Sequence, residues 1–384
     1  MKRAICVMLL CSVLLCGCTG GNKTVAQSAK DYITGVWFSY LELDEMLGGD
    51  FKAEFTEALY NCKILGITDI FVHIRPFCDS LYKSEYFPLR QTVQGLSFDA
   101  MKFMVDTAHE NQMRFHAWIN PYRVSRNPDV QSLSKDSPAY IWLNDEDAEN
   151  DQNVLFCDGI YLNPASSEAR RLVLDGVREI LQNYDVDGIH FDDYFYPTTD
   201  AEFDRAVYEK YCLDATDTLS LEDWRRANVN SLISGTYTAV KFHSKDKVFS
   251  ISPAASIQNN YETLFADVKA WLKGECVDMI IPQLYFGFDY PVQEYQFNNL
   301  VSEWKNMAKL GSADLIIGLA AYKIGTDSEP DRNEWNDNPT LLSRQTEVCR
   351  DDTDINGHIF YSYSSLFSDE PQTQAALNEL KIAT

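Results

Sequence analysis

The chain has 384 residues, 45% of them hydrophobic, which is long enough for one large domain or two ordinary ones with a sizeable core. Its 57 acidic and 33 basic residues give a formal net charge of −24. This acidity argues against a nucleic-acid-binding protein, which needs a basic surface, and against a face that binds anionic phospholipids.

Residues 1–18 have the pattern of a bacterial lipoprotein signal peptide. Two basic residues follow the first methionine, and residues 4–15 form a nearly uninterrupted apolar run that is too short to span a bilayer comfortably. A glycine precedes Cys18, as in a lipobox, although Cys16 stands where a smaller residue is usual. We therefore expect an exported lipoprotein of the cell envelope, lipidated on Cys18, with a polar tether over residues 19–30. An ordinary cleaved signal with incidental cysteines is the alternative.

The remaining cysteines indicate no metal or redox motif. Because none of them forms a C-x-x-C pair, neither a zinc knuckle nor a thioredoxin-like site is expected. Export permits disulfides, but sequence alone cannot pair them, and we expect most of these residues to be small and buried. They are Cys62, Cys78, Cys157, Cys212, Cys276 and Cys349.

Eight short β-branched or aromatic runs recur through residues 31–384, each followed by a loop and a helical pattern. The runs cover residues 33–40, 68–76, 114–120, 186–194, 247–256, 277–286, 314–324 and 357–364. Several are almost continuously apolar, as expected of parallel strands buried on both faces. No glycine-rich phosphate turn follows the first run, which disfavours an open nucleotide-binding sheet. The alternation predicts an α/β fold, a single-domain (β/α)8 TIM barrel with loop insertions.

Amphipathic helical patterns fill the spaces between the runs. Ser166 or Ser167 is placed to cap the third of them. The expected helices cover residues 54–65, 97–111, 167–184, 221–242, 261–274 and 294–310.

Polar and aromatic side chains gather where the predicted strands end, which is where TIM barrels carry their chemistry. Aromatic faces stack on sugar rings, while amides and charged groups bond sugar hydroxyls. We therefore expect a polysaccharide substrate. The candidate substrate-binding residues are Trp37, His73, Arg75, His116, Trp118, Asn120, Tyr122, Arg123, His190, Tyr194, Gln283, Tyr285, Tyr322, Lys323 and Tyr363.

No cofactor or metal is expected. A cofactor site would need a phosphate cradle or a lysine Schiff base, and Lys323 has no supporting arrangement for the latter. Three histidines on successive strands, His73, His116 and His190, could point inward together with Asp192 as a metal-ligand set. The interpretation that we favour is that these histidines fill layers of the barrel interior and hydrogen-bond one another.

The fourth run, Val-Asp-Gly-Ile-His-Phe-Asp-Asp-Tyr-Phe-Tyr, carries the most specific pattern. Strand alternation places His190 and Asp192 on the inner face and Asp193 on the outer one. At the end of the strand the pleat relaxes, so Asp193 can turn into the barrel mouth beside Asp192. Two adjacent carboxyl groups can then hold unlike pKa values, one ionised and one retained as an acid. The structural alternative is that one of the pair caps a loop or pairs with Arg75 or Arg123.

Several stretches resemble glycosyl-hydrolase-like family 10, a group of bacterial envelope proteins. The matching stretches are Gly-Val-Trp-Phe at 35–38, His-Ile-Arg-Pro at 73–76, His-Ala-Trp-Ile-Asn-Pro-Tyr-Arg at 116–123, Tyr-Leu-Asn-Pro-Ala at 161–165 and Asp-Gly-Ile-His-Phe-Asp-Asp-Tyr at 187–194. The resemblance implies a barrel fold and hydrolysis of an envelope glycan, since the family includes a lipoprotein that cleaves peptidoglycan glycans stripped of their peptides.

The fourth run is also similar to the Asp-Gly-x-Asp-x-Asp-x-Glu motif of chitinase-type hydrolases. In that alignment Asp192 matches the last aspartate, but Tyr194 stands in place of the catalytic glutamate. The proton would then have to come from Asp193 or from another loop. Asp79 is the candidate there, ahead of Glu85 and Glu262.

These observations predict a glycoside hydrolase that acts on an envelope glycan, with peptidoglycan glycan strands as the expected substrate. One carboxyl group would serve as the acid and another as nucleophile or base. The expected catalytic residues are Asp192, Asp193 and Asp79. One alternative is an inactive glycan-binding lipoprotein that scaffolds envelope enzymes, favoured by the missing glutamate. Another is metal-dependent deacetylation or hydrolysis that uses the histidines.

Overall fold

The computed structural model describes residues 32–327, 330, 332–336 and 338–383, so the expected signal peptide, its Cys18 and the tether lie outside the described residues. Residues 32–384 group into one compact unit. Eight parallel strands close into a barrel in the order β1-β11-β10-β9-β8-β7-β3-β2. They are β1 (Ile33–Phe38), β2 (Asp69–Arg75), β3 (Arg114–Ile119), β7 (Gly188–Phe191), β8 (Val248–Ile251), β9 (Met279–Ile280), β10 (Asp314–Ala320) and β11 (Gly357–Tyr361).

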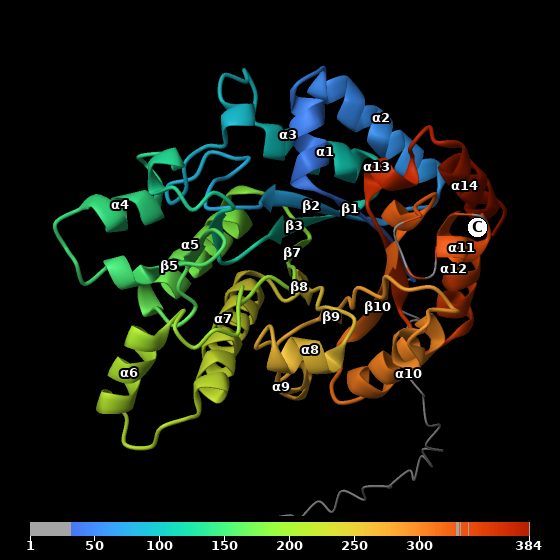
Figure 1. Ribbon diagram of the computed structural model, residues 1–384. Coiled ribbons are helices and arrows are strands. Elements are labelled where there is room, and N and C mark those ends of the chain that lie inside the picture. Colours follow the sequence, from blue (N-terminus) through green and yellow to red (C-terminus); the bar gives the residue numbers. More distant parts are fainter. Residues whose placement is uncertain (1–31, 328–329, 331, 337, 384) are drawn as a thin grey trace, which may run out of the picture. The chain divides into compact units, whose positions relative to one another are not determined.

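Helices surround the barrel on its outer side (Figure 1). The predicted TIM barrel is confirmed, since each of the eight expected runs contains one strand of the closed sheet. The helices are α1 (Tyr40–Leu47), α2 (Phe51–Ile64), α3 (Ala100–Glu110), α4 (Pro138–Asn144), α5 (Ser167–Asn183), α6 (Arg205–Asp214), α7 (Leu221–His243), α8 (Ile257–Glu262), α9 (Val268–Lys273), α10 (Phe297–Ala308), α11 (Arg332–Asn336), α12 (Leu341–Asp351), α13 (Tyr363–Leu366) and α14 (Pro371–Ala383).

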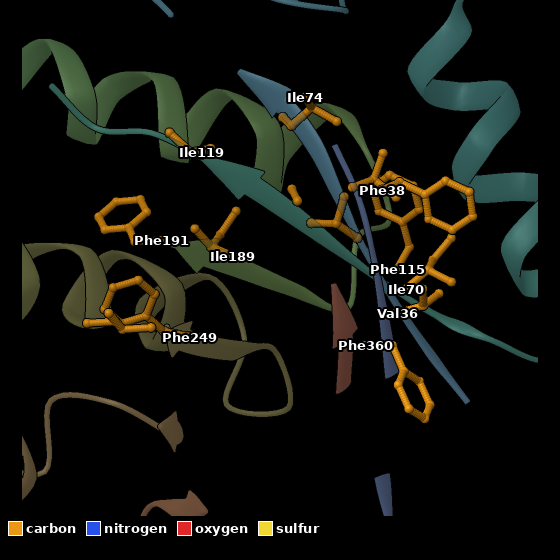
Figure 2. Close-up of a cluster of buried hydrophobic side chains, with 14 of the residues drawn as sticks. Val36, Phe38, Ile70, Ile74, Phe115, Ile119, Ile189, Phe191, Phe249 and Phe360 are labelled. Atoms are coloured by element: carbon orange, nitrogen blue, oxygen red, sulfur yellow. The ribbon is translucent and has the colours of Figure 1, made fainter. Parts of the chain in front are cut away.

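Both faces of the barrel strands are buried, which explains their almost continuously apolar sequences. Outward side chains such as Val36, Ile70 and Phe191 pack into the layer between strands and helices, as Figure 2 shows. Inward side chains form a separate cluster in the barrel interior. That inner cluster contains Ile33, Trp37, Phe71, Trp118, Met279, Ile281, Ile316 and Ile359.

The single helix expected over residues 261–274 is wrong, because the chain breaks there into α8 and α9. Phe265 has a positive φ of 52°, a left-handed conformation that no helix interior accommodates. Asp267 then begins α9 by accepting a hydrogen bond from the backbone N–H of Ala270 at 2.9 Å. The apolar residues keep a helical spacing across this break, which is why the sequence pattern predicts one helix.

The expected loop insertions include a small antiparallel sheet and the helices α4 and α6, whose positions the sequence pattern did not indicate. The sheet has the order β4-β6-β5, from β4 (Arg123–Ser125), β5 (Val154–Phe156) and β6 (Ile160–Leu162). It precedes α5, while α6 follows β7, and in Figure 1 these parts lie to one side of the barrel. In the part of the chain that the structure describes, no helix combines the length and the apolar character needed to cross a membrane.

Candidate active site

A cavity of about 280 Å³ lies at the carboxyl ends of the barrel strands. It brings together eight residues that the sequence analysis selected, including both aspartates of the fourth run. This is the end of the barrel where a TIM fold carries its chemistry. The lining residues are Trp37, Trp118, Asp192, Asp193, Tyr194, Ser252, Gln283, Tyr285, Tyr322 and Tyr361.

The carboxyl group of Asp192 lies on the inner face of the barrel, directly after β7, and the residue is only 3% exposed. Its Oδ2 accepts hydrogen bonds from Nε1 of Trp118 at 3.0 Å and from Nδ2 of Asn120 at 3.4 Å. The backbone N–H of Tyr194 donates to Oδ1 at 3.3 Å. Burial, and then the charge of Asp193, nevertheless raise the pKa of Asp192 to about 7. Near neutral pH this group therefore exists in both its acid and its ionised form.

Asp193 lines the same cavity, as the relaxed pleat at the strand end predicts. Burial raises the pKa of Asp193 above its ordinary value, while a hydrogen bond from Gln283 and the charge of Arg123 oppose that rise. The Gln283 amide also donates to the carbonyl oxygen of Ser252 at 2.9 Å, which holds its side chain in place. The cavity thus contains two adjacent carboxyl groups in different surroundings.

Aromatic rings form the walls around these carboxyl groups. Tyr285 stacks on Tyr361 with ring centroids 6.0 Å apart, and Tyr322 meets Tyr285 edge-on at 5.7 Å. At the rim, the guanidinium of Arg123 lies 3.8 Å from the ring centroid of Tyr194, which is 50% exposed. Aromatic faces beside carboxyl groups and amides suit a sugar ring, which has apolar C–H patches and many hydroxyls.

His190 lies beneath the cavity and is neutral. Nε1 of Trp37 donates to its Nε2 at 3.1 Å, and its Nδ1 lies 2.8 Å from Oγ of Ser250. Because an indole N–H can only donate, Nε2 must be an acceptor, so the ring proton is on Nδ1 and is donated to Ser250. Burial holds the pKa of His190 well below its ordinary value. His190 therefore supports Trp37 from below the cavity.

The other two expected histidines also pack inside the barrel. His116 is fully buried, lies 2.9 Å from Asp69 through its Nε2, and stacks on Phe71 at 4.2 Å between centroids. His73 stacks on Trp118, with centroids 3.7 Å apart and planes 8° from parallel, and burial lowers its pKa well below the usual value. Both residues thus fill interior layers, and His73 holds the indole that contacts Asp192.

The expectation that the three histidines hydrogen-bond one another is wrong, because His116 bonds Asp69 and His190 bonds Trp37 and Ser250. The described residues include no group of three or more His, Cys, Asp or Glu arranged to hold a metal.

Lys323 is also buried and is absent from the residues that line the cavity. Its Nζ donates to the carbonyl oxygen of Tyr285 at 2.8 Å and lies 5.4 Å from the ring centroid of Phe286. Lys323 therefore supports the chain segment that carries Tyr285.

Three further expected binding residues, Arg75, Tyr122 and Tyr363, are also absent from the residues that line the cavity. Arg75 is 1% exposed, with its guanidinium 4.2 Å from the ring centroid of Phe87, because the β2–β3 register shifts just before it. Tyr122 is 1% exposed and is not among the lining residues. Tyr363 begins α13 and stacks on Phe38 at 4.7 Å, since β11 has already ended at this point.

Asp79, the expected alternative proton donor, lines a different and larger cavity. Its Oδ2 accepts a hydrogen bond from Nη1 of Arg90 at 2.8 Å, and Arg90 also pairs with Asp44 at 2.6 Å. Burial raises the pKa of Asp79. The structure therefore brings Asp192 and Asp193 together and places Asp79 elsewhere.

Two lining residues, Ser252 and Tyr361, were not selected from the sequence. Oγ of Ser252 lies 3.1 Å from Nε2 of His190 and so belongs to the hydrogen-bonded floor of the cavity. Tyr361 is the last residue of β11. Ending the eighth run at this tyrosine, rather than three residues later, is the signal that would have placed it at the barrel mouth.

Comparison with known proteins identifies the family of the chain and proteins that share its fold. The family model described as glycosyl hydrolase-like 10 matches residues 32–337. Glycosyl hydrolase YngK of Bacillus subtilis is 32% identical over 339 residues, 82% of this chain and 64% of YngK, so the chain spans less than two thirds of that relative. Glycosyl hydrolase DigH of Escherichia coli K12 is 30% identical, over 83% of this chain and 76% of DigH. The glycoside hydrolase domain of PgaB (BpsB) from Bordetella bronchiseptica shares the fold, with a TM-score of 0.57 and 13% identity over 92% of this chain and 99% of that domain.

Proposed function

The chain belongs to the glycosyl hydrolase-like 10 family, and we propose that it hydrolyses glycosidic bonds of a bacterial envelope glycan at the cavity that contains Asp192 and Asp193. The observation that carries the proposal is the pairing of these two carboxyl groups inside an aromatic-walled cavity at the catalytic end of the barrel.

The two carboxyl groups have complementary roles in this proposal. Asp192, whose pKa is raised to about 7, is the proton donor to the leaving glycosidic oxygen as the bond to the anomeric carbon breaks. Asp193, nearer the rim and bonded by Gln283, is the ionised partner that attacks the anomeric carbon or takes a proton from the attacking water. Trp118 and Asn120 both donate to Oδ2 of Asp192, whereas Oδ1 accepts, among the described residues, only the backbone N–H of Tyr194, so the second lone pair of Oδ1 is the position for the transferable proton.

Peptidoglycan glycan strands are the proposed substrate. The resemblance of the strand-end motifs to envelope hydrolases, and the lipoprotein-like start of the chain, support an envelope polymer. The tyrosine and tryptophan walls provide faces for amino-sugar rings, while Gln283 and the two carboxyl groups provide polar contacts. No cofactor is needed for hydrolysis by a pair of carboxyl groups.

The test is digestion of purified sacculi, with and without their peptides, followed by mass spectrometry and an assay for new reducing ends. Asp192→Asn and Asp193→Asn should each lower the rate by about 10²–10⁴-fold, because each removes one of the two carboxyl groups that act in breaking the glycosidic bond. Asp175→Asn is a matched control, since Asp175 is an ion-paired carboxylate on α5, bonded to Arg178, outside the cavity. Normal digestion by both cavity variants would overturn the proposal.

Two further measurements, a glycan pull-down and digestion in EDTA, separate the alternatives. An inactive scaffold would bind glycan strands in a pull-down without releasing new reducing ends, and the replacement of the chitinase-type glutamate by Tyr194 is what favours it. A metal-dependent hydrolase would lose activity in EDTA and regain it when zinc is added. The carboxylate mechanism predicts cleavage that is insensitive to EDTA.

A further inference from the structure

A second cavity, of about 630 Å³, lies between two loops on the barrel side that carries the candidate active site. One loop follows β2 and the other follows β3, and parallel strands of a barrel end on the same face. The cavity is lined by Phe77, Cys78, Asp79, Pro88, Leu89, Arg90, Gln91 and Gln94 from the first loop, and by Val124, Ser125, Arg126, Asn127, Ser132, Leu133, Ser134 and Ser137 from the second.

A row of rings connects the two cavities. Trp118 lines the active-site cavity and stacks on His73 at 3.7 Å between centroids. Tyr40 meets His73 edge-on at 5.6 Å and meets Phe77 edge-on at 5.3 Å. Phe77 lines the larger cavity. The two cavities therefore lie at opposite ends of one short series of packed aromatic side chains.

Hydrogen bonds hold the walls of the larger cavity in place. The backbone N–H of Arg90 donates to the carbonyl oxygen of Ser80 at 2.8 Å. The backbone N–H of Ser80 donates to the carbonyl oxygen of Pro88 at 3.1 Å. In the second loop, the N–H of Asn127 donates to Oγ of Ser125 at 3.0 Å. These bonds form the cavity without a ligand, so binding would need little ordering of the chain.

Two polar groups at this cavity have no conventional hydrogen-bond partner. Oδ1 of Asp79 is buried and unpaired, although Oδ2 of the same carboxylate bonds Arg90. Oγ of Ser137 is also unpaired in a residue that is 3% exposed, with only the weakly polar Cys78 thiol beside it. Both atoms are enclosed, so each becomes available to a ligand only when its side chain turns toward the cavity. Because buried polar groups left unpaired are costly, a ligand that then donates to one and accepts from the other gains free energy.

We propose that this larger cavity is a second sugar-binding position, which holds a distal unit of the same glycan chain that is cut beside Asp192. The inference rests on the proposed function. Sugar hydroxyls both donate and accept, as Asp79 and Ser137 require, and Phe77 offers an apolar face. Arg90 pairs with both Asp79 and Asp44. Arg126 is the other charged lining residue. Two negative and two positive charges leave no net charge at the cavity, which therefore suits a hydroxyl-rich ligand. Asp79 then acts in binding and has no part in proton transfer.

The test compares kcat/KM for size-fractionated glycan strands that are long enough to reach both cavities with kcat/KM for short oligomers. Asp79→Asn and Ser137→Ala should each lower the ratio of long-strand to short-oligomer kcat/KM by about tenfold, the value of one lost hydrogen bond. Gln91→Trp changes an exposed lining residue and should lower the same ratio by filling the cavity. Asp352→Asn is the control, because Asp352 is an ion-paired carboxylate of similar exposure away from this cavity.

The outcomes distinguish this inference from the proposed function. If the wild-type chain releases no reducing ends from any glycan, the proposed function fails, and this inference fails with it. If the wild-type chain cleaves glycans but folded variants of Asp79, Ser137 and Gln91 keep the wild-type ratio, only the second sugar-binding position is overturned. A selective loss of long-strand cleavage, absent from Asp352→Asn, supports it.

Discussion

The carboxyl group of Asp192 receives three hydrogen bonds and still keeps a raised pKa. Donors from Trp118, Asn120 and Tyr194 favour the ionised form. Burial and the neighbouring charge of Asp193 raise the pKa by more than these donors lower it. A buried carboxylate loses its hydration, and two like charges share one small cavity. The raised pKa is therefore a consequence of packing and of sequence neighbours together.

This raised pKa predicts a pH-dependent stability cost. The folded state binds the Asp192 proton more tightly than the unfolded state does, so the associated stability is fully present below about pH 3.9 and is lost as the pH rises to about 7. Asp192→Asn removes this titration. Its stability relative to the wild type should therefore improve by about 2–3 kcal/mol between pH 5 and pH 8, measured by urea unfolding.

Asp185→Asn provides a control of opposite sign. Asp185 is largely exposed and its pKa is lowered by Lys247, so its stabilising effect is present at neutral pH and lost in acid. If the relative stability of Asp192→Asn does not improve between pH 5 and pH 8, Asp192 is not the proton-holding group.

Gly188 lies beneath the site at a position where close packing leaves no room for a side chain. A Cβ atom at this position would lie 2.5 Å from Nδ1 of His116 and 2.8 Å from the carbonyl oxygen of Val248. The absence of a side chain lets the neighbouring interior layer close beneath His190 and Asp192. The glycine of the fourth-run motif is thus explained by sterics.

Among the elements, β7 determines where the carboxyl groups lie. It is only four residues long and pairs with β3 and β8, so Asp192 and Asp193 follow immediately after its last paired residue, Phe191. Asp192 keeps the inward direction of the strand alternation, whereas Asp193 turns into the cavity beside it. A longer strand would have kept the two side chains on opposite faces.

The start of α5 connects the barrel to the added three-stranded sheet. Oγ of Ser166 accepts hydrogen bonds from the backbone N–H groups of Glu168 and Ala169, both at 3.1 Å, and donates to Oδ1 of Asn153 at 2.5 Å. Ser166→Ala should lower the free energy of unfolding by about 1–2 kcal/mol, through the lost cap and the unpaired Asn153 oxygen. Urea denaturation measures this change.

Ser231→Ala is the matched control, because Ser231 is exposed in the interior of α7, where alanine is the better helix former. It should leave the unfolding midpoint unchanged or raise it slightly. Equal losses in the two variants would contradict the capping role of Ser166.

At the scale of the whole molecule, the proposed activity also requires the right compartment. The chain starts with a basic and then apolar segment that ends at Cys18, and we propose that lipid on this cysteine anchors the protein at a membrane of the cell envelope. This proposal concerns residues outside those that the structure describes.

Cys18→Ala should move the protein from the membrane fraction to the soluble exported fraction, because the lipid attachment atom is lost. Fractionation followed by immunoblotting measures the shift, and Cys16→Ala serves as the neighbouring control. Sensitivity of processing to globomycin should be present in the wild type and absent from Cys18→Ala. A wild-type protein that is already in the soluble exported fraction, and that Cys18→Ala leaves there, would point to an ordinary cleaved signal.

The barrel and the place of its site follow from local sequence patterns. Parallel strands buried on both faces need apolar side chains in both directions, so each of the eight strands is visible as a short apolar run. The strand-end rule then selects Asp192, Trp118, Tyr285 and most other residues of the cavity. These features depend on composition and short-range alternation, which a single sequence contains.

Only the tertiary structure decided which polar side chains at the strand ends reach the cavity. A register shift turns Arg75 away from the cavity, and the early end of β11 places Tyr363 in α13. Asp79 lines a separate loop cavity. The raised pKa of Asp192 likewise requires the burial that the closed barrel creates. The physical reason is that alternation holds only while a strand is paired, whereas beyond its last paired residue long-range packing sets the direction of each side chain.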